Sequence, residues 1–378
     1  MKKLGLYFHI PFCNSKCLYC DFDSHVSAYE ERRSYVDALI KEIKLAKEKY
    51  EIEKYTIDTI FIGGGTPTAL DNDLLEKLLF EIDGNFSFSD DLEYSIEINP
   101  NSIEEEKVKI LQKSRINRIS IGLQSANEVE LKSLGRSHSY EDFEKTYHLL
   151  KEYGFDNISV DLMMGIPNQT LGSYKNTMEK VLKLQPSHIS SYMLIIEDGT
   201  AFAKMYEKGL IRVDDDFTLK LYDYTIKHLQ SQGYEQYEIS NFAKKGKKCR
   251  HNIRYWKVEE YLGLGQSAAS YINKARFSNS DKDYVQSISN NIIPITDYCL
   301  QTKNDLYEEW IFLKLRMNEG IIIDEMDEKF SMNFREKYSQ VLESLKSRKL
   351  INDYKHSLSL TRDGFKLSNS IFLELMYR

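Results

Sequence analysis

Short apolar segments alternate with amphipathic segments over about the first 230 residues of the 378-residue chain. The apolar runs have the length of buried strands and fall at residues 5–9, 58–62, 93–98, 118–123, 157–163 and 188–194. The segments between them carry apolar residues at helical spacing, at 28–49, 72–81, 104–112, 140–152 and 171–183. This alternation predicts right-handed crossovers and a parallel α/β sheet. Six such units are too few for a closed eight-unit barrel but enough for a partial, TIM-like (β/α)6 barrel.

The rest of the chain has a different pattern. A helix is predicted over 216–230, and residues 241–285 are rich in glycine and aromatic residues with weak periodicity. From residue 305 onward, charged amphipathic helices lead to a short strand near residues 358–360. We therefore expect three parts: a partial barrel over 1–230, an α+β extension over 231–300, and a small helical, winged-helix-like domain over 301–378.

Polar residues gather where the predicted strands end. Three glycines occupy positions 63–65, Glu97 ends the third strand, and Ser120 and Gln124 share one face of the fourth. Ligands of parallel α/β proteins sit at these carboxyl-terminal strand ends. The glycines match neither a dinucleotide-binding nor a P-loop pattern, and a tight turn explains them equally well.

Three of the five cysteines lie within eight residues, as Cys13, Cys17 and Cys20. Soft thiolates at this spacing suit three irons of a [4Fe–4S] cluster, and they leave the fourth iron open. A zinc site that recruits His9 or His25 is the main alternative, although no second ligand pair follows. A disulfide framework would need an even and dispersed set of cysteines.

Composition and charge limit the expected partners and the expected location of the protein. The formal charge of −7 leaves no wide basic field, so a nucleic acid is not an expected partner. No apolar stretch reaches the length of about 18 residues that a transmembrane helix needs. The N-terminus resembles a signal peptide, but His9 and Pro11 interrupt it, and we interpret it as a first strand. A cytoplasmic location is expected, where thiols stay reduced.

Taken together, the motifs resemble the radical S-adenosylmethionine (SAM) superfamily, and within it the HemN/HemW family of coproporphyrinogen III oxidase-like proteins. The segments that carry the resemblance span nearly the whole chain: H-I-P-F-C with C-x3-C-x2-C from His9, G-G-G-T-P from Gly63, E-x-N-P from Glu97, R-x-S-x-G-x-Q-S from Arg118, L-G-R-x-H from Leu134, D-L-x-x-G-x-P from Asp161, and C-x-H-N-x-x-Y-W from Cys249.

The resemblance implies roles for individual residues. The three cysteines would bind the cluster, and SAM would complete the coordination of its open iron. Residues near the cluster and the methionine moiety would be Tyr7, Tyr19, Gly64, Gly65 and Thr66. Residues holding the remainder of one or two SAM molecules would be Glu97, Gln124, Arg136 and Asp161. No catalytic residue is assigned.

Three features favour the HemW branch of this family. The cysteine run ends Cys20-Asp21-Phe22 without the further cysteine of HemN-type oxidases, only twelve residues precede Cys13, and the H-N-x-x-Y-W segment begins at His251. The resemblance implies heme as a third cofactor, with His251 or Cys249 as its axial ligand.

We therefore expect a heme chaperone that delivers heme to apo-hemoproteins, such as respiratory enzymes at the membrane. Transient membrane association and a homodimer are compatible with that role. The alternative is an oxygen-independent coproporphyrinogen III oxidase, an activity that the missing cysteine argues against. Whether SAM is cleaved is left open.

Overall fold

The computed structural model describes residues 1–280 and 282–376. Its contacts group the chain into two compact units. The first unit contains Met1–His228 and Glu260–Cys299, and the second contains Leu229–Glu259 and the chain from Leu300 onward. The segment expected as one extension, 231–300, is thus shared between the two units, and the three-part domain division stays a prediction.

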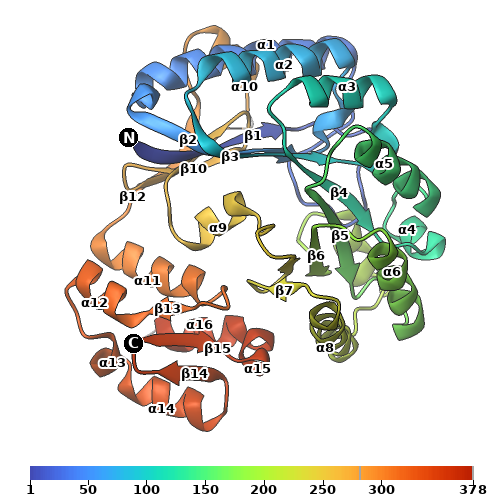
Figure 1. The fold of residues 1–378 in the computed structure, drawn as a ribbon. Helices are drawn as coiled ribbons and strands as arrows, with labels where there is room; N and C mark the ends of the chain where they lie inside the picture. Colours follow the sequence, from blue (N-terminus) through green and yellow to red (C-terminus); the bar gives the residue numbers. More distant parts are fainter. Residues whose placement is uncertain (281, 377–378) are drawn as a thin grey trace. The chain divides into compact units, whose positions relative to one another are not determined.

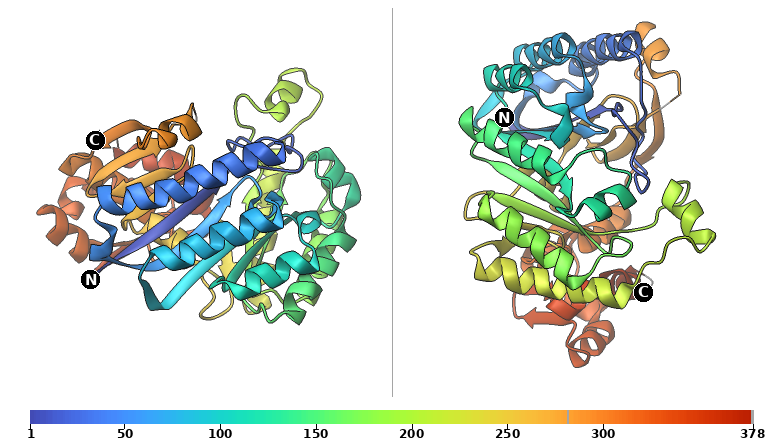
Figure 2. Two further views of the ribbon diagram at one scale, coloured as in Figure 1. Left: turned by 90° about the horizontal axis from the view of Figure 1, so that it is seen from above. Right: turned by 90° about the vertical axis from the view of Figure 1, so that its right-hand side faces the viewer.

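Six parallel strands, each hydrogen-bonded to the next in chain order, form the centre of the first unit. They are β1 (Lys2–Ile10), β2 (Tyr55–Gly64), β3 (Phe88–Ile98), β4 (Arg118–Gln124), β5 (Ile158–Met164) and β6 (His188–Met193). The main crossover helices are α1 (Tyr29–Lys49), α2 (Asn72–Asn85), α3 (Glu105–Lys113), α5 (Tyr140–Glu152) and α6 (Leu171–Lys183). These helices cover one face of the curved sheet (Figures 1 and 2), so the first unit contains the expected partial barrel.

The strands alternate apolar and polar positions, which separates the two faces of the sheet. Leu6 and Phe8 of β1 and Ile96 of β3 have no exposed surface, and they belong to the core between sheet and helices. The intervening positions carry polar side chains, such as Glu97 on β3 and Asp161 on β5. This polar face is the inner face of the partial barrel, and it carries the candidate site.

Beyond β1, the sheet of the first unit continues into a part of the chain that the sequence pattern left unassigned. Strand β9 (Tyr261–Leu264) pairs in parallel with β1, and β10 (Ala269–Ile272), β11 (Ala275–Asn279) and β12 (Ile295–Leu300) follow in the sheet order. Helix α10 (Tyr284–Ser289) lies against α1. The partial barrel is therefore extended at its β1 edge by residues more than 250 positions later in the chain.

The second unit combines short helices with a three-stranded antiparallel sheet in the order β13 (Ile321–Ile322), β15 (Ser357–Leu360), β14 (Ile351–Tyr354). Its helices are α9 (Arg250–Trp256), α11 (Lys303–Lys314), α12 (Ile323–Phe330), α13 (Phe334–Lys337), α14 (Ser339–Ser347), α15 (Arg362–Lys366) and α16 (Ser368–Met376). The buried side chains of Trp310, Phe330 and Phe334 supply its core. Within the described residues, no helix is both long and apolar enough to cross a membrane.

Candidate functional site

The loop that carries the three cysteines connects β1 to α1 and is held by backbone hydrogen bonds. The N–H of Cys13 donates to the carbonyl of His25 at 2.9 Å, which closes the base of the loop. Its middle is fixed by Leu18, whose N–H donates to the carbonyl of Leu134 at 3.0 Å. The carbonyl of Leu18 accepts from the N–H of Phe202 at 2.9 Å. Segments that follow β4 and β6 therefore place the loop at the carboxyl-terminal end of the sheet.

The three thiols are free and partly buried. The sulfur of Cys13 lies 3.6 Å from the hydroxyl oxygen of Thr66, and Nη1 of Arg136 donates to the sulfur of Cys17 at 3.3 Å. Burial raises the pKa of Cys20, and the nearby Cys17 and Cys13 raise it further. In the part of the chain that the structure describes, no three His, Cys, Asp or Glu side chains are grouped to hold a single metal ion. The role of the cysteines as cluster ligands stays a prediction.

The glycine loop at the end of β2 packs directly against the base of the cysteine loop. Gly65 donates from its N–H to the carbonyl of Ile10 at 2.8 Å, and a Cβ there would lie 2.6 Å from the carbonyl oxygen of Phe12. Gly64 has a φ of +108°, and its Cβ would lie 2.5 Å from the imidazole of His9. A side chain at either position would therefore push the two loops apart.

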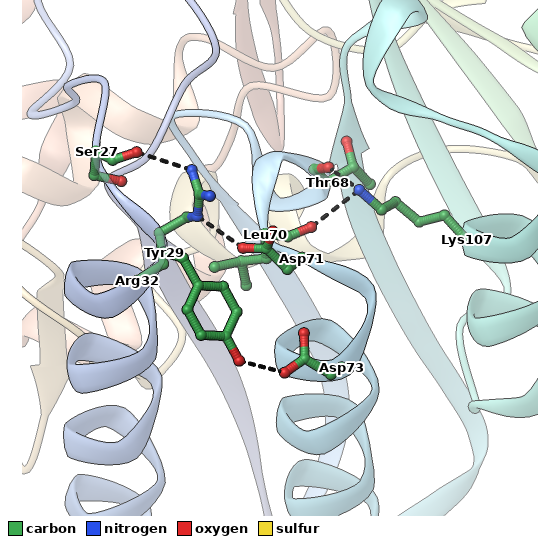
Figure 3. Close-up of polar contacts among 8 residues, drawn as sticks. All are labelled: Ser27, Tyr29, Arg32, Thr68, Leu70, Asp71, Asp73 and Lys107. Atoms are coloured by element: carbon green, nitrogen blue, oxygen red, sulfur yellow. Dashed lines mark hydrogen bonds and ion pairs between the residues drawn. The ribbon is translucent and has the colours of Figure 1, made fainter.

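The end of the cysteine loop is tied to the segment after the glycine loop (Figure 3). Arg32 of α1 donates to the carbonyl of Ser27 at 3.0 Å and to the carboxylate of Asp71 at 2.9 Å. One turn away, the hydroxyl of Tyr29 donates to Asp73 of α2 at 2.6 Å. These contacts fix the first turn of α1 against the first turn of α2.

A lysine of α3 holds the same segment from its other side. The ammonium of Lys107 donates to the carbonyls of Thr68 and Leu70, at 2.6 and 2.9 Å (Figure 3). Burial lowers the pKa of Lys107. The chain that follows the glycine loop is therefore anchored to both α1 and α3.

Two carboxylates face each other across the inner face of the sheet. Burial and, second, the nearby Asp161 raise the pKa of Glu97, and the hydrogen bond from the Gly64 N–H at 3.3 Å lowers it; the net pKa is about 8. Burial also raises the pKa of Asp161, although the hydroxyl of Ser120 donates to both of its oxygens at 3.2 and 3.3 Å. Arg118 is buried near both carboxylates and lowers both pKa values.

Gln124 and Arg136 carry polar atoms that the described protein does not satisfy. Gln124 has a φ of +67°, uncommon for a residue with a side chain, and its buried Oε1 has no hydrogen-bond partner among the described residues. Nε of Arg136 is also buried without a partner among them. Arg136 donates to the carbonyl of Gly122, where a Cβ would lie 2.7 Å from its Nη2. Buried groups of this kind indicate a site for a polar ligand.

Of the two tyrosines expected near the cofactors, Tyr7 belongs to β1 and Tyr19 to the cysteine loop itself. The hydroxyl of Tyr7 lies 3.0 Å from Nδ1 of His9, and burial raises the pKa of Tyr7. Tyr19 packs edge-on against Phe202, with ring centroids 6.4 Å apart. Burial raises the pKa of Tyr19 as well. Both phenols are therefore neutral hydrogen-bonding groups at neutral pH.

These residues fit the chemistry of SAM. The guanidinium of Arg136 suits its carboxylate, and acceptors such as Glu97, Asp161 and Oε1 of Gln124 suit its ammonium group and ribose hydroxyls. The predicted residues are thus gathered at one end of the inner face. Their assignment to particular groups of SAM stays a prediction.

His251, the predicted heme ligand, is fully buried in α9 of the second unit. Its Nε2 lies 2.7 Å from the hydroxyl of Tyr255, and the two rings meet edge-on with centroids 5.0 Å apart. Cys249 is also fully buried, and its N–H donates to the hydroxyl of Tyr237 at 3.2 Å. Coordination by His251 through Nε2 would require its hydrogen bond to Tyr255 to break.

One contact of the cysteine loop was not predicted from the sequence. Asp23 accepts hydrogen bonds from the side chains of Gln266 at 2.9 Å and Ser267 at 2.6 Å. Its carbonyl oxygen lies 2.9 Å from Nε2 of His9. The closely spaced glycines at 263 and 265 were the only local signal of a tight turn there.

Comparison with known proteins agrees with this architecture. A family model for the radical SAM superfamily matches residues 7–181, and a model for the HemN C-terminal domain matches residues 301–367. The solved structure of coproporphyrinogen III oxidase (HemN) from Escherichia coli superimposes with a TM-score of 0.87. The alignment covers 100% of this chain and 90% of that one at 24% identity, so it supports the fold alone.

Curated relatives share more of the sequence. The heme chaperone HemW of Lactococcus lactis is 36% identical, over 98% of this chain and 97% of its own. That of Bacillus subtilis is 35% identical over 97% of both chains. The heme chaperone HemW of Escherichia coli is 36% identical over 70% of this chain and 69% of its own.

Fold, cysteine loop and family model together define a radical SAM protein. Within that superfamily, the chain belongs to the HemW family. Membership of the superfamily implies a [4Fe–4S] cluster and SAM as cofactors.

Proposed function

We propose that this protein is a heme chaperone: it binds heme together with a [4Fe–4S] cluster and SAM, and it delivers heme to apo-hemoproteins such as respiratory enzymes. The observation that carries the proposal is the similarity to heme chaperones along almost the whole chain, at 36% and 35% identity. The chain also contains the H-N-x-x-Y-W segment from His251.

The inner face of the first unit supplies the groups for the cluster and SAM. Cys13, Cys17 and Cys20 would bind three irons, and the amino and carboxylate groups of SAM would complete the coordination of the fourth. When bound, the cluster and SAM together would supply one-electron radical chemistry. Arg136 would orient the SAM carboxylate through its planar fork, while it keeps its hydrogen bond to Cys17.

Heme would bind through the second unit, with His251 as axial ligand and Cys249 as the competing candidate. Both side chains are fully buried here. Heme binding would therefore select a conformation in which α9 exposes its ligand, and the cost of that opening lowers the affinity. Moderate affinity suits a carrier, because a protein that must deliver its ligand also has to release it.

A heme titration tests the proposal. We would add heme to the wild type and to the variants His251→Ala, Cys249→Ser and His356→Ala, and record the Soret band. His356 is exposed and pairs with Asp324, so its variant controls for the loss of any histidine in the second unit. The proposal expects a changed spectrum and at least about tenfold weaker binding for one of the first two variants only. No saturable heme binding by the wild type would contradict it.

A second assay separates the chaperone from the oxidase. The anaerobically reconstituted protein would receive SAM, a reductant and coproporphyrinogen III. The proposal expects no conversion to protoporphyrinogen, since Asp21 and Phe22 follow Cys20 where HemN-type oxidases have a further cysteine. Efficient conversion would establish the oxidase instead. In parallel, heme-loaded protein should pass heme to a purified apo-hemoprotein.

A further inference from the structure

A buried carboxylate outside the candidate site joins α1 to the strands that extend the barrel. Glu42 is only 1% exposed. Its Oε2 accepts from the N–H of Gly265 at 2.7 Å and from the hydroxyl of Tyr284 at 2.6 Å, and its Oε1 accepts from the amide of Asn279 at 2.6 Å. All three donors come from residues 265–284, far from Glu42 in sequence. Because a buried carboxylate is costly unless its oxygens are satisfied, Glu42 holds these segments in a defined arrangement.

The Glu42 contacts fix the turn between β9 and β10. Gly265 begins this turn with a φ of +101°, and a Cβ there would lie 2.5 Å from the hydroxyl of Tyr35 and 2.7 Å from the carbonyl of His9. That hydroxyl donates to the His9 carbonyl at 2.7 Å and accepts from the N–H of Gln266 at 3.2 Å. The turn is therefore pressed against the end of β1, where the cysteine loop begins.

The same turn reaches the cysteine loop three residues after Cys20. Gln266 and Ser267 both donate to one carboxylate oxygen of Asp23, at 2.9 and 2.6 Å. The backbone of Asp23 is held as well, since its carbonyl oxygen lies 2.9 Å from Nε2 of His9. Hydrogen bonds at both ends of the turn, joined by its backbone, thus connect Glu42 to Asp23.

We propose that Glu42 is a positioning residue for the cluster site: through Gln266, Ser267 and Asp23 it fixes the part of the loop that presents Cys20. The inference rests on the cluster ligands proposed above and not on heme binding. It assigns a function in cofactor assembly to a carboxylate and a turn that lie outside every motif of the sequence.

The test compares three variants of the 378-residue chain. Glu42→Gln replaces one carboxylate oxygen by an NH2 group. Because NH2 cannot accept a hydrogen bond, at least one of the three hydrogen bonds to Glu42 is lost. Asp23→Ala breaks the connection at the loop. Tyr284→Phe also deletes a hydrogen bond to Glu42, but Tyr284 belongs to α10 and not to the turn that contacts Asp23, so this variant controls for a general loss of stability. Glu42→Asp, whose carboxylate is one methylene shorter, replaces Glu42→Gln if that variant does not fold.

Two readouts are measured. In the cluster-free protein, the rate at which a maleimide labels Cys20 is followed by mass spectrometry. The proposal expects labelling at least about threefold faster in Glu42→Gln and Asp23→Ala, and unchanged in Tyr284→Phe. After anaerobic reconstitution, the first two variants should retain about half the wild-type iron or less, with an altered EPR signal.

The double variant Glu42→Gln, Asp23→Ala should equal Asp23→Ala, because both act through one connection. Wild-type behaviour of Glu42→Gln would overturn the proposal, and so would equal effects of Glu42→Gln and Tyr284→Phe. A wild type that takes up no iron would contradict the cluster assignment, whereas the labelling rates would still decide the role of Glu42.

Discussion

The guanidinium of Arg136 donates a hydrogen bond to the sulfur of Cys17, with 3.3 Å between Nη1 and Sγ. The same side chain donates to the carbonyl of Gly122 at the end of β4. A residue that the sequence assigns to SAM binding therefore also contacts a predicted cluster ligand. The guanidinium group of Arg136 therefore connects the cysteine loop to the inner face of the sheet.

Replacement of Arg136 by lysine keeps the charge but not the fork, because an ammonium group acts as a point charge. A charged hydrogen bond contributes about 1.5–3 kcal/mol, so we expect Arg136→Lys to weaken SAM binding by about tenfold or more. Equilibrium dialysis with the reconstituted protein measures this. Lys132→Met, at an exposed position nearby, is the control and should bind SAM as the wild type does.

The pKa of Glu97 predicts a pH dependence of stability in the cluster-free protein. Burial raises this pKa from its usual 4.5 to about 8, so the folded state binds a proton more tightly than the unfolded state. The stabilisation is fully present below about pH 4.5 and is lost as the pH rises through about 8. A single group contributes at most about 1.4 kcal/mol per pH unit.

Thermal unfolding of the wild type and of Glu97→Gln at pH 5, 6.5 and 8 tests this dependence. The variant cannot ionise at this position, so its melting temperature should fall less steeply with rising pH. It should still fall to some extent, because burial raises the pKa of Asp161 too. Parallel curves for the two proteins would show that Glu97 titrates normally.

Gly64 should tolerate no side chain. Its φ of +108° and the 2.5 Å approach of a Cβ to His9 predict that Gly64→Ala unfolds more easily, by about 2 kcal/mol or more, and loads little iron. Gly84 in α2 is the matched control, since a Cβ there meets no atom within 4 Å. Gly84→Ala should be neutral or stabilising by up to about 1 kcal/mol. Chemical denaturation and iron analysis measure both effects.

The hydrogen bond between Tyr255 and His251 predicts how the variant Tyr255→Phe binds heme. Tyr255→Phe keeps the ring that packs on the imidazole but removes the hydroxyl that lies 2.7 Å from Nε2. If His251 is the axial ligand, this loss favours coordination, and heme should bind about two- to tenfold more tightly. Unchanged binding in Tyr255→Phe together with weaker binding in Cys249→Ser would make Cys249 the ligand.

The sequence predicted helices and strands well where apolar residues recur at regular spacing within one element. The helix expected over 28–49 is α1 (Tyr29–Lys49), and Ser120 of β4 donates to Asp161 of β5 on the inner face. Strands β9 to β11 were not predicted, because each is too short to show a clear alternation of apolar and polar residues. The pairing of β9 with β1 joins residues more than 250 positions apart, and no local periodicity indicates such a pairing.

Motifs predicted which residues gather at the site but not what holds them there. Glu97, Asp161 and Arg136 were expected from their positions at strand ends and in motifs. The contacts of the Asp23 and Glu42 carboxylates were not expected, since their partners lie more than 200 residues away and a single aspartate or glutamate carries no pattern. The left-handed backbone of Gln124 was equally invisible, because it results from the surrounding packing.

The central claim is that three cysteines hold a [4Fe–4S] cluster whose fourth iron is open to SAM. EPR spectroscopy of the anaerobically reconstituted and reduced protein, with and without SAM, tests it most directly. We expect about four irons and four sulfides per chain and a clear change of the EPR signal when SAM is added. Stoichiometric zinc, or a cluster signal that SAM leaves unchanged, would contradict it.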